Sequence, residues 1–499
     1  MKPYLILLAL LLATFPSTAQ FTLSGTIRNY SGGHPLTVNL PVVFGFHKEN
    51  TQTIPMGHLG TFRITLPADS LQTATLFFRK KQITILMQPG GSLAIELDEN
   101  ARTVRFTGGS LAKENQWIQE TKLDEAPFFW ENDSLAALPE AKIRQSVLAP
   151  YAAERNRHIQ AILASGVPHP TQQYLISELR YLHINYLHDF FSTSIPDRAT
   201  ARNLEMSLFD EVPIQPAFSH PGPQYFAFAD NYIRYLETKA FVQIQKENRP
   251  PSAPIPYFGI SLDSANVIVS KYGKAYWRWI GSLRNFPPEI AVAYNWQQIR
   301  NLYHDGDIAQ AEGLSSAFLQ RFPDSRFSAS VARMRNQLRN KLAANAGNPR
   351  IVVLEDSADT QSVQAVVQRL KGKVVFLDVW GTWCGPCKEE IKHLPALRAA
   401  FPGEEVAFVF LAMDDDNRHA IWKDFIRANA MEGTHFRKTR QTIPPLWNEL
   451  LENHPDKSQS YPQYFLFDKS GKLAVAKAHH PSEGEVLYRQ IRDVLSKVE

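Results

Sequence analysis

Cysteine is scarce in this chain. Among 499 residues only Cys384 and Cys387 carry a thiol, and they lie three positions apart. Two cysteines this close can close only one local loop, so a framework of disulfides that ties distant segments together is excluded. The pair is therefore expected to react rather than to staple the fold.

A second pair of metal ligands is missing too. A closed zinc site needs four ligands, normally with a second Cys or His pair at short spacing. Several histidines of the C-terminal region form no such spacing, namely His393, His435, His454, His479 and His480. We therefore expect no metal, and we expect no cofactor.

A large surplus of positive or negative residues is absent as well. Lys and Arg number 53 against 49 Asp and Glu, so nucleic acid is not expected as a partner. The hydrophobic share of 44% and the charged share of 20% are those of a globular chain without long disorder. A length of 499 residues exceeds what one core serves and favours several domains.

The apolar run at the start of the chain is too short to span a bilayer. It extends from Leu5 to Phe15, follows Lys2 and ends in small residues up to Ala19, which is the order of a secretory signal. We predict a signal peptide over residues 1–19, with Gln20 where a lipoprotein would carry cysteine. The mature protein is then soluble and periplasmic, or otherwise extracytoplasmic. The alternative is an uncleaved N-terminal anchor, which the short run disfavours.

Residues 20–109 alternate apolar and polar side chains in short runs bounded by Gly, Pro and Asn. The segment 60–66 is one example, and the runs 83–86 and 93–97 lie on either side of a Pro-Gly-Gly turn. Period-two patterning with turns at this spacing predicts an N-terminal all-β sandwich.

Residues 110–344 change to a helical period. One helical face carries a spacing of three or four residues through Leu175, Leu179, Leu182, Tyr186 and Phe190. We predict a central all-α domain, with these side chains in its core rather than in a ligand groove. The segment 306–325 resembles a single tetratricopeptide-type hairpin, and without a second copy at a fixed period it predicts no repeat array.

The C-terminal region, residues 345–499, has the element order of a thioredoxin fold. The apolar run 374–379 is typical of a buried parallel strand, and the cysteine motif follows it at once. A second apolar run, 406–411, comes after a helical stretch, and a third, 464–467, precedes a hairpin turn. Strand, helix, strand, hairpin and terminal helix predict an α/β domain here, the third part of a multidomain chain.

The placement of the cysteines suits disulfide exchange. Cys384 follows a buried strand and opens a helix, where free backbone N–H groups stabilise a thiolate. We predict that Cys384 is the exposed catalytic nucleophile. Cys387 lies one turn further in, where it would attack the mixed disulfide and release the partner, leaving a redox disulfide between the two.

The motif Trp383-Cys384-Gly385-Pro386-Cys387, with the strand before it, resembles the extracytoplasmic thioredoxin-like family that includes the TlpA-like and ResA-like reductases. The resemblance implies that Trp383 flanks the nucleophile at the surface that binds substrate. It also implies that Asp378, six residues before Cys384, relays the proton of the resolving cysteine. The alternative for Asp378 is a hydrogen-bonded core carboxylate.

The resemblance implies a further contact to substrate at Tyr461 and Pro462, through a cis peptide bond beside the cysteines. Some family members carry another acid after the second strand, where this chain has Asp414, Asp415 and Asp416; we interpret these as a solvated acidic loop. The family's helix-kinking proline is displaced here to Pro395, which leaves the helix geometry near the site open.

The resulting prediction is a thiol-disulfide oxidoreductase that acts on protein disulfides, as a reductant or isomerase supplied by a membrane electron donor. The alternative is a binding or assembly protein that uses the thioredoxin domain for docking, although docking does not require two thiols. A peroxidase of the peroxiredoxin type would carry Thr and Pro where Gly381 and Leu377 stand. The oligomeric state is left open.

Overall fold

The computed structural model describes residues 20–43, 48–99, 104–120, 125–216, 221–355, 360–403 and 405–496. The predicted signal peptide, residues 1–19, lies outside the described residues. Among the helices of the described residues, none combines the length and the apolar character that a bilayer crossing requires. Two compact units make up the chain, and the second contains residues 251–254, 260–281 and 291–499.

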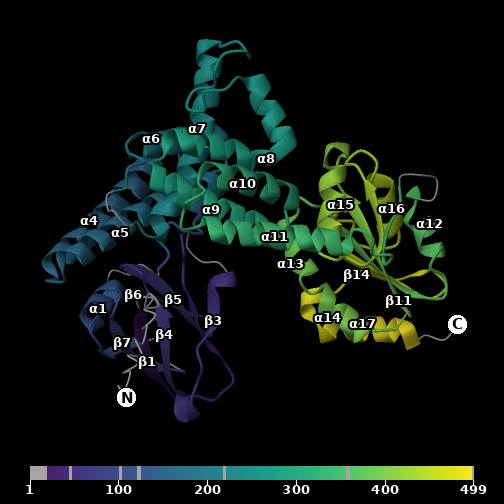
Figure 1. Ribbon diagram of the computed structural model, residues 1–499, viewed down its shortest axis with the longest axis horizontal. Helices are drawn as coiled ribbons and strands as arrows, with labels where there is room; N and C mark the ends of the chain where they lie inside the picture. The colour runs from purple at the N-terminus through teal and green to yellow at the C-terminus, as the bar shows by residue number, and fades with distance from the viewer. Residues whose placement is uncertain are drawn as a thin grey trace, which may run out of the picture. The chain divides into compact units, whose positions relative to one another are not determined.

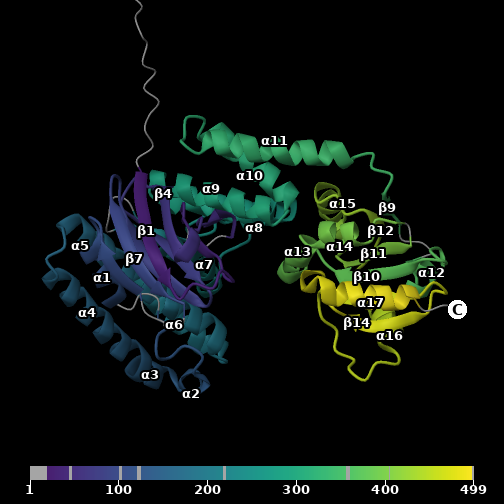
Figure 2. The ribbon, with the colours of Figure 1, turned by 90° about the horizontal axis from the view of Figure 1, so that it is seen from below.

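The first unit starts with strands arranged in two sheets within residues 20–108. The strands are β1 (Gln20–Arg28), β2 (Leu36–Asn39), β3 (Thr51–Thr53), β4 (Thr61–Pro67), β5 (Gln72–Phe78), β6 (Lys81–Met87), β7 (Ser92–Asp98) and β8 (Val104–Gly108). One sheet has the order β4-β1-β7-β8, and the other has the order β3-β2-β5-β6. Figure 2 shows β4, β1 and β7 of the first sheet side by side. Both sheets contribute to one hydrophobic core, which includes Leu23 and Leu76. One apolar face on each sheet follows from the alternation of side chains along a strand.

Helices follow the sheets in the first unit. They are α1 (Ala112–Glu120), α2 (Asp133–Ala136), α3 (Glu140–Ile143), α4 (Ala149–Ala164), α5 (His169–Asp189), α6 (Arg198–Asp210) and α7 (Pro223–Glu247). Buried aromatic and aliphatic side chains, among them Phe129, Phe190 and Leu204, form a hydrophobic cluster between several of them.

Four further helices lie between α7 and the last sheet in the described chain: α8 (Leu262–Asn285), α9 (Pro288–His304), α10 (Ile308–Arg321) and α11 (Ser328–Asn345). The hairpin of α10 and α11 belongs to the second unit. Ile308, Ala311 and Leu338 of this hairpin form a buried cluster with Ala428 of a later helix. The boundary predicted at residue 344 therefore falls within the second unit.

The second unit holds a mixed sheet with helices on both faces (Figure 1). Its strands are β9 (Ile351–Val353), β10 (Val374–Trp380), β11 (Val406–Met413), β12 (Gly433–Lys438), β13 (Gln463–Phe467) and β14 (Leu473–Ala478). Its helices are α12 (Val363–Gln368), α13 (Gly385–Ile391), α14 (Leu394–Ala400), α15 (His419–Ala428), α16 (Pro444–Leu451) and α17 (Glu485–Ser496). The sheet order is β14-β13-β10-β11-β12-β9, with β11 parallel and β13 antiparallel to β10. The α/β element order predicted for this region is confirmed.

The central strand β10 is buried along its whole length. Phe376 and Trp380 point to one face, where α13, α14, α15 and α17 pack, and Leu377 points to the other, beneath α12 and α16. Because side chains alternate along a strand, Asp378 points to the same face as Phe376 and Trp380. Cys384 and Cys387 belong to the hydrophobic cluster on that face.

Candidate active site

Cys384 and Cys387 lie at the end of β10, where the strand turns into α13. Cys384 is the N-cap residue of this helix, and Pro386 stands in its first turn, where a missing N–H costs nothing. The two cysteines are joined by a disulfide. The backbone N–H of Cys387 also donates a hydrogen bond to Cys384 Sγ, at 3.1 Å. A backbone donor aimed at this sulfur stabilises negative charge on it once the disulfide is reduced.

The prediction that Cys384 is exposed is wrong. Only 3% of its surface is accessible, and it packs in the hydrophobic cluster that also contains Cys387. The strand before it is fully buried, and the turn that follows brings the cysteine back over the apolar face of the sheet. Access to the sulfur is therefore confined to a narrow part of the surface.

Trp383 is the exposed residue of the motif, with 47% of its surface accessible. Its indole Nε1 donates a hydrogen bond to the carbonyl oxygen of Met413, at 2.7 Å. Gly381 makes room for this contact, because a Cβ added there would lie 2.5 Å from Trp383 Nε1. The exposed ring is thus held in one orientation beside Cys384.

Tyr461 brings the segment before β13 to the same place. Its ring meets the Trp383 ring edge-on, with centroids 5.2 Å apart, and its hydroxyl accepts a hydrogen bond from Trp447 Nε1 at 3.0 Å. The Tyr461–Pro462 peptide bond is cis, as predicted. Pro462 precedes Gln463, which pairs with Val379 at the end of β10, so both residues lie at the end of the sheet that carries the cysteines.

Asp378 is buried beneath the motif, with 2% of its surface accessible. Within the described part of the chain, its Oδ1 atom has no hydrogen-bond partner. Burial raises the pKa of this carboxyl well above its ordinary value of 3.8, and the negative charge of Glu390 raises it further. The alternative of a hydrogen-bonded core carboxylate is not supported for this oxygen atom.

The C-terminal domain is similar to known proteins. The AhpC/TSA family model matches residues 352–476. The thiol-disulfide oxidoreductase ResA of Bacillus thuringiensis (strain Al Hakam) is 31% identical over 140 residues, which cover 28% of this chain and 72% of that protein. The chain belongs to the ResA family of thiol-disulfide oxidoreductases. A second ResA, from Bacillus thuringiensis subsp. konkukian, is 26% identical over 147 residues, again 28% of this chain and 72% of that protein.

A solved structure also resembles the C-terminal domain that contains the matched residues 352–476, which we call the ResA-like domain. The thioredoxin domain of a thiol-disulfide oxidoreductase from Bacteroides vulgatus is 23% identical, with a TM-score of 0.21. The match covers 26% of this chain and 83% of that chain.

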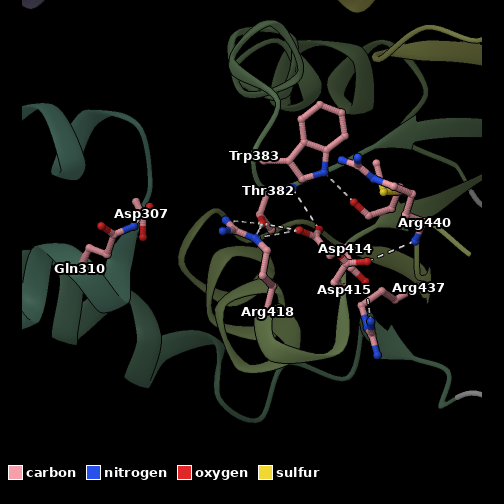
Figure 3. A network of polar contacts seen from close by, with 10 residues as sticks. Asp307, Gln310, Thr382, Trp383, Asp414, Asp415, Arg418, Arg437 and Arg440 are labelled. Atoms are coloured by element: carbon pink, nitrogen blue, oxygen red, sulfur yellow. Dashed lines mark hydrogen bonds and ion pairs between the residues drawn. The ribbon is translucent and has the colours of Figure 1, made fainter. Parts of the chain in front are cut away.

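The acidic loop after β11 was expected to be solvated, and this is wrong for Asp414, of which 1% of the surface is accessible. Asp414 accepts hydrogen bonds from the N–H of Thr382 at 3.0 Å and from its hydroxyl at 2.6 Å (Figure 3). Burial raises the pKa of this carboxyl, while the donors from Thr382 and the cation Arg418 oppose the rise. Asp415 and Asp416 are exposed, as expected of a solvated loop.

Thr382 and Arg418 of the ResA-like domain were not identified from the sequence. Arg418 lies just before α15 and donates to Thr382 Oγ1 and to Asp414 Oδ1. A threonine between Gly and Trp carries no signal of its own. The only available hint was the position of Thr382, two residues before the nucleophile.

The active-site helix of the ResA-like domain ends early. Helix α13 stops at Ile391, and α14 begins at Leu394 with Pro395 in its first turn. A proline is tolerated there because the first N–H groups of a helix have no intrahelical partner. The displaced proline thus starts a new helix instead of kinking one helix. No cluster of three or more metal-binding side chains occurs within the described residues.

Proposed function

We propose that this chain is an extracytoplasmic oxidoreductase that exchanges disulfides with protein substrates through Cys384 and Cys387. The observation that supports it is the disulfide at the start of α13, beside an exposed and oriented Trp383. The enzyme class follows from the ResA relatives, whereas the roles of the individual residues belong to this proposal.

In the reduced enzyme, the Cys384 thiolate attacks one sulfur of a substrate disulfide. A bond forms between Cys384 Sγ and that sulfur, and the other substrate sulfur leaves as a thiolate and takes up a proton. The Cys387 thiolate then attacks Cys384 Sγ and releases the second substrate thiol. Two electrons have passed to the substrate, and the enzyme is left with the Cys384–Cys387 disulfide.

Asp378 acts in the second step. Cys387 must lose a proton before it can attack, and its buried position keeps bulk water away. A buried carboxylate on the same face of the sheet can accept that proton because its raised pKa lies closer to that of a thiol. Asp378 is therefore the proton relay for Cys387.

Trp383, Tyr461 and Pro462 form the surface to which an extended segment of the substrate binds. The two aromatic rings contact each other, and the end of β13 lies next to the end of β10. The arrangement supports a binding mode in which the substrate backbone lies beside Cys384. Because Cys384 is accessible only from this surface, extended protein segments can reach it more easily than the surface of a folded domain can.

The electron flow runs toward the substrate, so the enzyme works as a reductant or isomerase. Gly385 and Pro386 add neither a charge nor a side-chain donor to the thiolate, and the same dipeptide occurs in thioredoxin, with a potential of about −270 mV. A reducing couple outside the cytoplasm needs a supply of electrons, which a membrane electron donor would deliver. The location rests on the predicted signal peptide.

The β-rich segment 20–109 and the helical segment 110–344 act as accessory domains of this enzyme. The shared core of the two N-terminal sheets supports a sandwich, and helices α1 to α7 support a helical part in the same unit, whereas α10 and α11 belong to the unit of the catalytic domain. The catalytic domain spans residues 345–499.

The deciding experiment compares insulin reduction by the wild type with that by Cys384→Ala. Loss of activity in a folded variant is expected. The alternative is a binding or assembly protein that docks through this domain. Under this alternative, neither the wild type nor the variant reduces insulin, and both bind the partner equally well.

A further inference from the structure

Arg418 faces the loop that leads from β10 to the cysteines (Figure 3). Its Nε and Nη2 atoms donate to Thr382 Oγ1, at 3.0 and 2.9 Å, and Nε also donates to Asp414 Oδ1 at 3.2 Å. Thr382 precedes Cys384 by two residues. The guanidinium therefore binds the active-site loop without lying in the cysteine motif.

The Thr382 hydroxyl is fully used in this network. A threonine hydroxyl has one hydrogen to donate and two lone pairs that accept. The hydrogen goes to Asp414 Oδ1, at 2.6 Å, and both lone pairs face nitrogen atoms of Arg418. Because Thr382 is buried, losing one of these partners leaves a polar group without a substitute.

The turn between α9 and α10 packs close to the same region. Gly306 has a φ of 69°, and a Cβ added to it would lie 2.9 Å from the Phe425 ring and 3.0 Å from Asn429 Nδ2. Both of those residues lie in or next to α15, the helix that Arg418 precedes. A glycine is required at this turn because of the close approach and the positive φ.

Asp307, the next residue, carries the charge of this turn. Gln310 Nε2 donates to its Oδ2 at 2.6 Å, whereas within the described residues Oδ1 has no hydrogen-bond partner. Lys388 and Arg418 are the cations that act on this carboxyl, against the effect of burial, which raises its pKa. Figure 3 shows Asp307 and Gln310 on the side of the network toward which the Arg418 guanidinium extends.

We propose that Arg418 is a positioning residue of the active-site loop, and that Asp307, in the turn before α10, helps to orient its guanidinium through charge rather than through a direct contact. Arg418 acts through Thr382 and Asp414 and does not touch the sulfur atoms. The inference rests on the proposed role of Cys384. It gives the helices before the ResA-like domain a part in the geometry of the active site.

The first test uses the full chain with Arg418→Met, and Arg427→Met as the matched control. Arg427 lies on α15, and within the described residues its guanidinium forms one ion pair, a surface contact to Asp424 at 3.8 Å. We expect Arg418→Met to lower kcat/KM for insulin reduction about tenfold, because a misplaced nucleophile loses its attack geometry. Arg427→Met should stay within about twofold of the wild type.

A second readout separates positioning from stability. In a Cys387→Ser background, where Cys384 is the one thiol, Arg418→Met should slow alkylation by iodoacetamide about threefold. Circular dichroism confirms the folded fraction. If Arg418→Met does not fold, Thr382→Val and Thr382→Ser replace it, since serine keeps the hydroxyl and valine removes it. Rescue by serine alone is expected, and equal activity of both variants overturns the proposal.

The link to the hairpin is tested by a double-mutant cycle. Asp307→Asn alone should lower kcat/KM about threefold, and Asp307→Asn with Arg418→Met should be no worse than Arg418→Met. Additive losses would show that Asp307 does not act through Arg418. If Arg418→Met matches Arg427→Met, the positioning role fails. If instead Cys384→Ser retains reductase activity, the proposed function itself fails, whatever the Arg418 variants show.

Discussion

Asp378 of β10 and Tyr464 of β13 lie directly opposite each other in the antiparallel register. Both are buried, and within the described residues neither Asp378 Oδ1 nor Tyr464 Oη has a hydrogen-bond partner. Burial raises the pKa of both side chains. Burial therefore favours the protonated form of both groups, and Asp378 can accept a proton only after it has ionised, which costs stability in this apolar surrounding.

Asp378→Asn should slow disulfide reduction, most near neutral pH. There the Cys387 thiol is protonated and depends on the ionised carboxylate to remove its proton. At low pH Asp378 is itself protonated in the wild type, and at high pH hydroxide can deprotonate Cys387, so the gap between variant and wild type should narrow in both directions. Rates of insulin reduction measured across pH test this, and a constant ratio of the two rates would remove Asp378 from the mechanism.

Asp378 should also make stability depend on pH. Its pKa is higher in the folded than in the unfolded chain, so the folded state binds more protons between the two values. The free energy of unfolding therefore falls as the pH rises from about 4 through the folded pKa. Asp378→Asn should be more stable than the wild type at neutral pH and equally stable below about pH 4. Urea midpoints measure this, with the exposed Asp415→Asn as control.

Cys384→Ala should abolish insulin reduction and cost a little stability. The sulfur is buried, so its removal loses about 1 kcal/mol of packing, in addition to the loss of the disulfide. Activity and the thermal midpoint are measured on the same preparation, and Cys387→Ala in parallel shows the shared effect of losing the disulfide.

Cys387→Ser should accumulate mixed disulfides through Cys384, because the group that resolves them is missing. Non-reducing electrophoresis of an extracytoplasmic extract shows the adducts, and mass spectrometry identifies the trapped proteins. Cys384→Ser with Cys387→Ser serves as the control that cannot form adducts. Capture of glutathione alone would argue against protein substrates.

Trp383→Ala should raise KM for insulin about tenfold and leave reduction of a small disulfide nearly unchanged, since a large exposed aromatic ring contributes mainly to protein contacts. Trp383→Phe keeps an aromatic ring but loses the hydrogen bond to Met413. Its KM for insulin should therefore lie between those of the wild type and Trp383→Ala. Equal losses with both substrates would assign Trp383 to the geometry of Cys384 instead.

The Cys384–Cys387 couple should have a potential near that of thioredoxin, about −270 mV, rather than that of the oxidase DsbA, about −120 mV. Equilibration with glutathione buffers, followed by quantification of the two thiols, measures it. A value above roughly −150 mV would make the chain an oxidase.

The local chemistry of the site could be predicted from residues that are close together in the chain. A buried apolar strand, a short turn and a Gly-Pro pair form a strand–turn–helix unit, and that unit places Cys384 at a helix start whatever surrounds it. The orientation of Asp378 could be predicted in the same way. Because side chains alternate along a strand, Asp378 points to the same face of the sheet as Phe376 and Trp380. Such features depend on residues within a few positions of one another.

Which acid of the loop is buried, and what it binds, depends on contacts between segments far apart in the chain. Asp414, Asp415 and Asp416 are chemically alike and adjacent, and only the pairing of β11 with its neighbours buries the first against Thr382, thirty-two residues away. The burial of Cys384, the position of Tyr464 opposite Asp378 and the close approach of Gly306 to Phe425 have the same origin. Each depends on contacts between segments far apart in the chain, and the energy of those contacts comes from packing that no local pattern specifies.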